Sequence, residues 1–137
     1  MTAAPGRLLH VARLAVRWGD MDALGHVNNA WYFKYMEQAR IAWFDALGIP
    51  MIQDDQGPVL VTASCTFLRP IVYPAEIEVA IYGDTPGRSS FNVHHVIHKA
   101  DDPDTRYAEG DTKVVWFDHT AGRSVPVPEH IRRHLPE

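Results

Sequence analysis

Apolar and polar residues recur with two different periods along the chain, and each period predicts a type of element. Between Asn29 and Leu47, apolar residues recur every three or four positions, as on one face of an α-helix. Asn28 or Asn29 can cap its start, because a side-chain oxygen there accepts a backbone N–H. Gly48 and Pro50 predict its end, since Gly tolerates a left-handed backbone and Pro cannot continue a helix. The pattern therefore predicts one long helix over residues 29–47.

Alternation with a period of two, typical of strands with one buried and one solvated face, occupies much of the remaining chain. The clearest example is Glu76–Tyr82, where isoleucine and valine alternate with glutamate and alanine. A last short helical piece is expected after Pro128. The predicted strands are Leu9–Trp18, Val59–Leu68, Glu76–Tyr82, Ser89–Lys99 and Thr105–Phe117.

The predicted elements follow the order strand, long helix, and then four strands joined by short links. These links are rich in proline, glycine and aspartate, which favours turns between antiparallel neighbours. The helix carries apolar side chains around much of its circumference, so we expect it to be enclosed. The sequence thus predicts an α+β domain in which an antiparallel five-stranded sheet wraps round one long central helix. The length suits a single domain over residues 1–137.

Composition argues against several classes of function. The formal net charge of −4 disfavours a general nucleic-acid surface, because phosphate contacts need clustered Lys and Arg. No apolar run reaches the ~20 residues of a membrane helix, and the first ten residues lack the apolar stretch of a secretory signal. Cys65 is the single cysteine, so no intrachain disulfide can form. We therefore expect a cytoplasmic protein without nucleic-acid or membrane partners.

Chemically capable residues concentrate between Asp20 and Asn29, immediately before the predicted helix. This segment holds two carboxylates, a histidine, a glycine and two asparagines. The first turn of a helix presents unpaired backbone N–H groups and a partial positive charge, which stabilise an oxygen that becomes negative during acyl transfer. A carboxylate beside that oxygen can activate water as a general base or attack the carbonyl directly. The pattern favours hydrolysis of a thioester, whose thiolate leaves easily.

A larger set of motifs extends this interpretation over nearly the whole chain. The motifs are WGDMDALGHVNN (18–29), Tyr32, EQAR (37–40), FLRP (67–70), RSSF (88–91) and AEG (108–110). Together they resemble the 4-hydroxybenzoyl-CoA thioesterase branch of the hotdog-fold acyl-CoA thioesterases. Residues 26–29 differ from those of the aryl-CoA member, so the resemblance is to a Gly-His-Val-Asn-Asn subgroup, whose substrates are acyl-CoAs of varied kind. It implies a hotdog fold and acyl-CoA hydrolysis.

The resemblance also implies roles for individual residues. Asp22 matches the family's catalytic aspartate, three positions before Gly25, whereas Asp20 is the runner-up and more often structural. The Asn29 backbone N–H is expected to polarise the thioester carbonyl. His26 contacts substrate or orients Asp22 in this interpretation, with a simple loop hydrogen bond as an equal alternative. The expected substrate and coenzyme A contacts are Arg88, Ser89, Ser90, Arg69, Asn28 and Tyr32. Arg69 is a weaker candidate than segment 88–90, as is Lys99, and a solvated turn is an equal alternative for segment 88–90.

The assembly and cofactors follow from the same resemblance. It implies a homodimer with joined sheets and active sites at the subunit interface, and often a homotetramer formed from two dimers. No metal or redox cofactor is expected, and coenzyme A enters as part of the substrate. The histidines of the fourth predicted strand do not suggest a metal site. His94 and His98 would lie ~13 Å apart along a strand, and His95 points the opposite way.

Two other functions are compatible with the same fold. A hotdog protein can bind acyl-CoA without cleaving it, and nothing in the sequence excludes this. A hotdog dehydratase uses an Asp or His on the central helix. Residues 30–47 contain no His, and their single Asp, Asp45, is near the far end. The sequence therefore favours the thioesterase, with the binding protein as its alternative.

Overall fold

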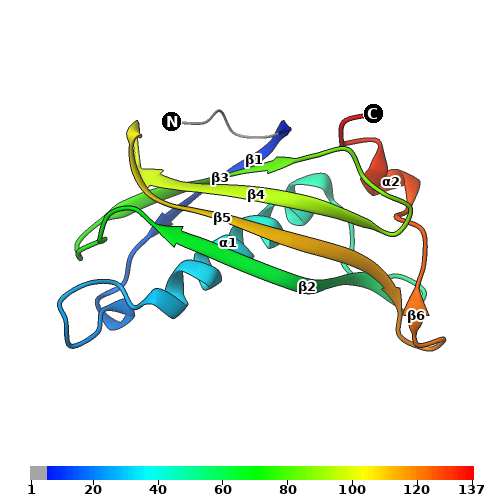
Figure 1. The fold of residues 1–137 in the computed structure, drawn as a ribbon, viewed down its shortest axis with the longest axis horizontal. Helices are drawn as coiled ribbons and strands as arrows, with labels where there is room; N and C mark the ends of the chain where they lie inside the picture. Colours follow the sequence, from blue (N-terminus) through cyan, green and yellow to red (C-terminus); the bar gives the residue numbers. More distant parts are fainter. Residues whose placement is uncertain (1–5) are drawn as a thin grey trace.

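The computed structural model describes residues 6–137 and shows a curved antiparallel sheet packed against one long helix (Figure 1). The strands are β1 (Arg7–Ala15), β2 (Gln56–Phe67), β3 (Glu76–Gly83), β4 (Ser90–Lys99), β5 (Asp102–Asp118) and β6 (Arg123–Ser124). The helices are α1 (Asn29–Leu47), the short α2 (Glu129–Arg132) and a 3-10 turn, η1 (Trp18–Asp20). Residues 1–5, which belong to the segment examined for a secretory signal, lie outside this description.

The sheet has the order β1-β3-β4-β5-β2, and every pairing is antiparallel. The predicted antiparallel sheet and the predicted helix bounds are confirmed. The sequence pattern predicts that the first strand ends at Trp18, but β1 ends at Ala15 and residues 18–20 form η1. The two-residue strand β6, paired with β5, is too short for an alternation pattern to predict.

The short links predict that consecutive strands pair with each other, and this prediction is wrong for β2 and β3. β2 and β3 follow each other in sequence, yet β2 pairs with β5 at the edge of the sheet. The distance from β2 to β3 is three strand spacings, roughly 14 Å. The link 68–75 covers up to about 26 Å when extended, so it can cross the end of the sheet.

The core lies between the sheet and one face of α1. That face buries Tyr32, Tyr35, Met36, Ala39, Trp43 and Phe44, and the inward side chains of β3, including Ile77, Val79 and Ile81, are fully buried. The other face of α1 is open in a single chain, with Phe33, Lys34 and Glu37 exposed. The helix is therefore covered on one side only, whereas its apolar circumference predicted enclosure.

The edge strand β2 exposes an unusual amount of apolar surface. Leu60, Val61 and Phe67 are each more than 40% exposed, as is Leu68 just after the strand. Among the strands of residues 6–137, β2 is the last in the sheet, so one side of its backbone has no strand partner there. Both features mark β2 as the surface on which a single chain is least complete.

Candidate active site

The loop before α1 is held in place by its own backbone. The Asp22 N–H donates to the His26 carbonyl at 2.9 Å, and the Gly25 N–H donates to the Asp22 carbonyl at 3.1 Å. Gly25 has a φ of +82°, which glycine adopts without the steric cost of a side chain. Val27 is buried, and its N–H donates to the Ile71 carbonyl at 2.9 Å. The turn therefore sets where the Asp22 side chain lies.

Both carboxylate oxygens of Asp22 accept hydrogen bonds. Oδ1 accepts from the Leu24 N–H at 2.9 Å, and Oδ2 lies 3.4 Å from Asn28 Nδ2, which donates to it. Asp22 is only half-buried, so solvent and ligand can reach it. These two donors orient the carboxylate without enclosing it.

The start of α1 lies directly after this loop. Asn28 is the N-cap, and its Oδ1 accepts from the Ala30 N–H at 2.9 Å. The Asn28 carbonyl accepts from the Trp31 N–H at 2.9 Å. Within residues 6–137, the Asn29 N–H forms no hydrogen bond. The first residue of α1 thus presents a free donor at the positive end of the helix dipole.

These groups surround one pocket of about 330 Å³. Its lining consists of Asp22, Leu24, His26, Val27, Asn29, Tyr32, Phe67, Leu68, Arg69 and Pro70. Five residues predicted from the sequence are therefore brought together, namely Asp22, His26, Asn29, Tyr32 and Arg69. Asn28 contributes through its contact with Asp22. The pocket combines a carboxylate, a free N–H and an apolar wall.

Tyr32 links the pocket to the core. Its side chain is buried, and its ring meets that of Phe67 edge-on at 4.8 Å between centroids. Burial raises the pKa of the Tyr32 hydroxyl. The ring therefore stays neutral at physiological pH and forms part of the wall.

The predicted segment 88–90 lies elsewhere in the same chain. Ser90 is opposite Val115 of β5, whereas Phe67 of the pocket is opposite Ala108. These two points are seven residues apart on β5, about 24 Å along the strand. The Arg88 carbonyl accepts from the Arg132 guanidinium of α2. Arg88, Ser89 and Ser90 are thus at the far end of the sheet from Asp22.

Asp20, the alternative catalytic carboxylate, is buried and hydrogen-bonded to other residues of the fold. It is 2% exposed, and its Oδ2 accepts from the Tyr35 hydroxyl at 2.7 Å and from the Arg17 N–H at 3.1 Å. An ion pair of 3.3 Å joins it to the Arg17 guanidinium. Burial, followed by the Asp20 carboxylate, raises the pKa of Tyr35 far above its usual range. Asp20 does not line the pocket that holds Asp22.

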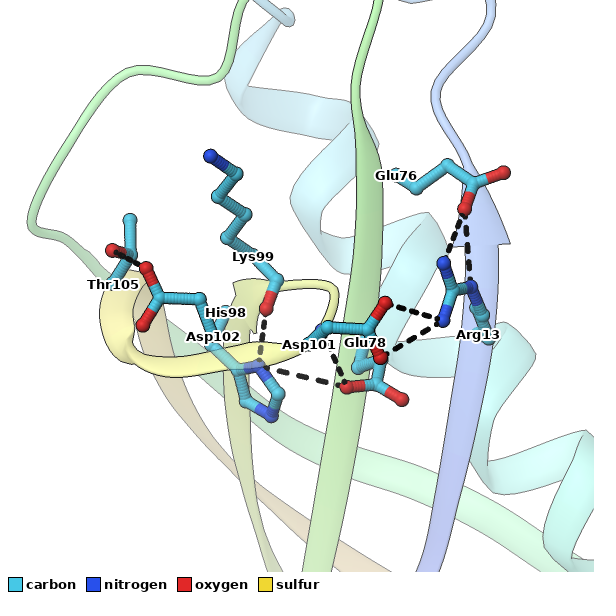
Figure 2. A network of polar contacts seen from close by, with 8 residues as sticks. All are labelled: Arg13, Glu76, Glu78, His98, Lys99, Asp101, Asp102 and Thr105. Carbon is cyan, nitrogen blue, oxygen red and sulfur yellow. Dashed lines mark hydrogen bonds and ion pairs between the residues drawn. The ribbon is translucent and has the colours of Figure 1, made fainter.

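The three histidines of β4 have separate contacts. His94 contacts Asp111 at 2.8 Å. The His98 Nδ1–H donates to the Lys99 carbonyl at 2.8 Å (Figure 2). His95 faces α1 and is fully buried. Among residues 6–137, no group of three His, Cys, Asp or Glu side chains is placed to hold a metal ion.

Lys99 lies at the acidic end of the sheet. Figure 2 shows the neighbouring network, in which Arg13 pairs with Glu76 at 2.6 Å and with Asp101 at 3.2 Å. The Asp101 N–H also donates to Glu78 at 3.4 Å. These carboxylates make the surroundings of Lys99 unfavourable for a phosphate group, because like charges repel.

Comparison with known proteins identifies the family. A family model described as the thioesterase-like superfamily matches residues 16–135. The chain belongs to this superfamily. Its α+β architecture is the hotdog fold. Among the described residues, no helix is long and apolar enough to span a membrane, and the cytoplasmic location stays a prediction.

Several relatives of this thioesterase-like chain are similar over most of its length. The PA2801 protein of Pseudomonas aeruginosa, described as a candidate thioesterase, is 47% identical, with 93% of this chain and 98% of that chain covered and a TM-score of 0.87. The BH1999 gentisyl-coenzyme A thioesterase is 27% identical, with 90% and 98% covered and a TM-score of 0.80. The uncharacterized protein YsmA of Bacillus subtilis is 27% identical over 61% of this chain, and the match spans 57% of YsmA.

Sequence reasoning missed one contact between a half-buried arginine and a buried histidine. Arg40, within the EQAR motif, contacts His95 on β4, 55 positions away. The motif drew attention to residues 37–40, but no local pattern connects a helix residue with a strand residue at that separation. The pairing becomes visible only in the folded chain.

Proposed function

We propose that this protein hydrolyses acyl-CoA thioesters to a carboxylic acid and free coenzyme A. The observation that carries the proposal is the pocket shared by the Asp22 carboxylate and the Asn29 N–H, which has no hydrogen-bond partner among residues 6–137. Similarity to the gentisyl-coenzyme A thioesterase supports a coenzyme A thioester as the substrate. The residues GHVNN (25–29) support membership of the subgroup with varied acyl-CoA substrates.

In the proposed reaction, the thioester carbonyl oxygen accepts a hydrogen bond from the Asn29 N–H. Negative charge that develops on this oxygen is stabilised by that donor and by the helix dipole. Asp22 then acts in one of two ways. As a general base it takes a proton from water, whose oxygen attacks the carbonyl carbon. As a nucleophile it forms a mixed anhydride that water later hydrolyses. In both routes the C–S bond breaks and the coenzyme A sulfur leaves as a thiolate.

Four further residues of the pocket have supporting roles in this proposal. Asn28 orients Asp22 through its side-chain amide, and Tyr32 forms the wall beside the reacting carbonyl. His26 contacts substrate at the exposed mouth, and Arg69 contacts the coenzyme A part of the substrate. No metal or redox cofactor takes part in either route.

We also propose that the working unit is a homodimer joined through β2, with two dimers forming a homotetramer. Antiparallel pairing of two β2 strands would cover the exposed apolar side chains and satisfy the open backbone edge. It would also place the Phe67 end of one β2 beside the Gln56 end of the other. Ser90 and Val59 are both opposite Val115, so the partner's segment 88–90 would approach the pocket from the second subunit. Arg88, Ser89 and Ser90 can then contact coenzyme A phosphates.

The proposal is tested by measuring thiol release from short, medium, long and aryl acyl-CoAs. We expect wild-type turnover, and we expect Asp22→Asn to lower kcat by about 10²- to 10⁴-fold, because an amide is neither base nor nucleophile. Asp45→Asn, the same chemical change at an exposed position on α1, serves as the control. Acyl-CoA binding without thiol release from any substrate would instead support the non-catalytic binding protein.

A further inference from the structure

The side chains of Arg40 and His95 meet between α1 and the sheet. Arg40 Nη1 lies 3.2 Å from His95 Nε2, and His95 Nδ1 lies 3.2 Å from the Gly110 carbonyl oxygen. The carbonyl can only accept, so the His95 proton is on Nδ1 and Nε2 accepts from Arg40. His95 is fully buried, and burial, followed by the Arg40 charge, lowers its pKa to about 3. The imidazole is therefore a neutral partner that holds the guanidinium in one place.

Within residues 6–137, Arg40 forms no ion pair, although the Glu37 carboxylate acts on its charge from a longer distance. None of the ion pairs that these residues form involves Arg40. Glu37, one turn earlier on α1, instead pairs with Lys34 at 3.3 Å. A guanidinium has five N–H donors, and His95 accepts only one of them. Partial burial of the Arg40 guanidinium costs solvation free energy, and an anion that accepts from its remaining N–H groups would offset this cost.

Arg40 lies in a groove between α1 and β2. One cavity of about 150 Å³ reaches from Ala30, in the first turn of α1, to Arg40. A second cavity of about 220 Å³ continues past Arg40 along apolar side chains that include Ile41 and Phe44. The two cavities share Glu37, Arg40 and Leu60, so they form one mainly apolar groove. We call this the α1–β2 groove.

The α1–β2 groove starts beside the donor proposed for the thioester carbonyl. Ala30 follows Asn29 directly, and Arg40 is eleven residues beyond Asn29, roughly 16 Å along the helix. Helical side chains tilt toward the N-terminus, which brings the guanidinium nearer to the first turn. An acyl chain of medium length placed with its carbonyl at Asn29 therefore ends near Arg40.

We propose that the α1–β2 groove binds the acyl chain of a dicarboxylic acyl-CoA, with Arg40 binding the carboxylate at the far end of that chain. The proposal rests on the proposed thioesterase activity, because it names the substrate class of that site. Apolar walls suit the methylene chain, and a guanidinium fork suits a carboxylate in a bidentate contact. The Arg40 guanidinium, which forms no ion pair within residues 6–137, favours an anion over a neutral hydroxyl. His95 is a positioning residue that acts through Arg40.

The test compares octanedioyl-CoA with octanoyl-CoA, which differ only in the terminal carboxylate. In the wild type we expect kcat/KM to be higher for octanedioyl-CoA. In Arg40→Met we expect the ratio of the two kcat/KM values to fall by about 10- to 100-fold, as for loss of a charged hydrogen bond. Arg40→Lys, which keeps the charge but loses the fork, should restore part of the ratio. Arg123→Met, at an exposed position on β6, should leave it unchanged.

A second measurement tests the role of His95. His95→Phe removes the acceptor that holds Arg40, so we expect KM for octanedioyl-CoA to rise while kcat changes little. A merely structural role would lower kcat for both substrates together. Equal wild-type kcat/KM for the two substrates would overturn the proposal. A second result would also overturn it, namely an equal loss of kcat/KM for both substrates in Arg40→Met together with dissociation of the oligomer in sedimentation. The anion that pairs with Arg40 would then come from a second copy of the chain.

A binding measurement separates this proposal from the thioesterase proposal. Calorimetric titration with the monoamide of octanedioate and with octanamide needs no thioester cleavage, and these two compounds differ only in the terminal carboxylate. Stronger binding of the octanedioate monoamide to the wild type, lost in Arg40→Met, supports the groove even if no acyl-CoA is hydrolysed. Failure of the proposed activity alone appears as absent thiol release with this difference intact. Equal binding of both compounds would contradict the assignment to Arg40.

Discussion

Asp20 and Asp22 are two residues apart, and their surroundings differ in kind. Asp20 is buried and accepts hydrogen bonds from Tyr35 and the Arg17 backbone, so its carboxylate is bound into the core. Asp22 is half-buried and opens onto a pocket. The same chemical group thus stabilises the fold at one position and is available to a substrate at the other.

Loss of a hydrogen bond to the Asp20 carboxylate should lower the stability of the fold and leave the chemistry of the pocket unaffected. Tyr35→Phe removes the hydroxyl that donates to the buried carboxylate. The free energy of unfolding should fall by about 1.5–3 kcal/mol, as for other hydrogen bonds to charged groups. Urea unfolding at a fixed protein concentration measures it, with the exposed Tyr73→Phe as the control. A loss no larger than in that control would show that the hydrogen bond contributes little.

His95 predicts a pH dependence of stability. Its pKa is lowered to about 3 in the folded chain, while an unfolded histidine titrates near 6.5. Between these values the unfolded state binds the extra proton, so stability falls as the pH falls. From pH 7 to pH 5, His95 should contribute a loss of about 2 kcal/mol. Urea unfolding of the wild type and His95→Gln at both pH values checks this, and parallel pH profiles would contradict it.

The N-terminal end of α1 combines a structural task with a proposed catalytic one. Asn28 Oδ1 caps the helix by accepting from Ala30, and its amide nitrogen donates to Asp22. Helix start, loop and carboxylate are therefore joined by one side chain. The helix itself was predictable from its period and its end signals, since both are local properties.

The two tasks of Asn28 can be separated by substitution. Asn28→Ser keeps a capping oxygen but loses the donor to Asp22, so stability should stay within a few tenths of a kcal/mol while kcat falls. Asn28→Ala should lose about 1 kcal/mol of stability as well. Thermal or urea unfolding and thiol release, measured on both variants, give the two readouts. Full activity in Asn28→Ser would show that the contact with Asp22 is unimportant for turnover.

For the whole molecule, the open edge of β2 is the dominant feature. It brings together exposed apolar side chains, an unpaired strand edge and the mouth of the α1–β2 groove. The opposite edge strand, β1, is nine residues long and shorter than the twelve-residue β2. Assembly through β2 would therefore bury more backbone and more apolar surface than assembly through β1.

The difference between β2 and β1 predicts that a lysine introduced on each edge strand will affect the oligomeric state differently. Val61→Lys on β2 should shift the protein toward monomers, because a lysine on an edge strand opposes pairing. Leu8→Lys on β1, also at an exposed apolar position, should leave the oligomer intact. Sedimentation velocity measures both, and thiol release should fall only in Val61→Lys. A dimer that survives Val61→Lys and dissociates in Leu8→Lys would place the interface on β1.

The sequence by itself determined the elements and the local part of the site. Helical and alternating periods, caps and turn residues depend on neighbours in the chain, so they predicted α1 and the five longer strands. The loop 20–29 and Asn29 at the helix start were likewise predictable, because they adjoin in sequence.

Only the tertiary structure decided which distant residues meet. It placed β2 at the edge beside β5, Arg69 in the pocket of Asp22, and segment 88–90 at the far end of the sheet. It also buried Asp20 and joined Arg40 to His95. These outcomes depend on how the sheet curves over α1 and on where the link 68–75 crosses it, and neither leaves a periodic signal in the sequence.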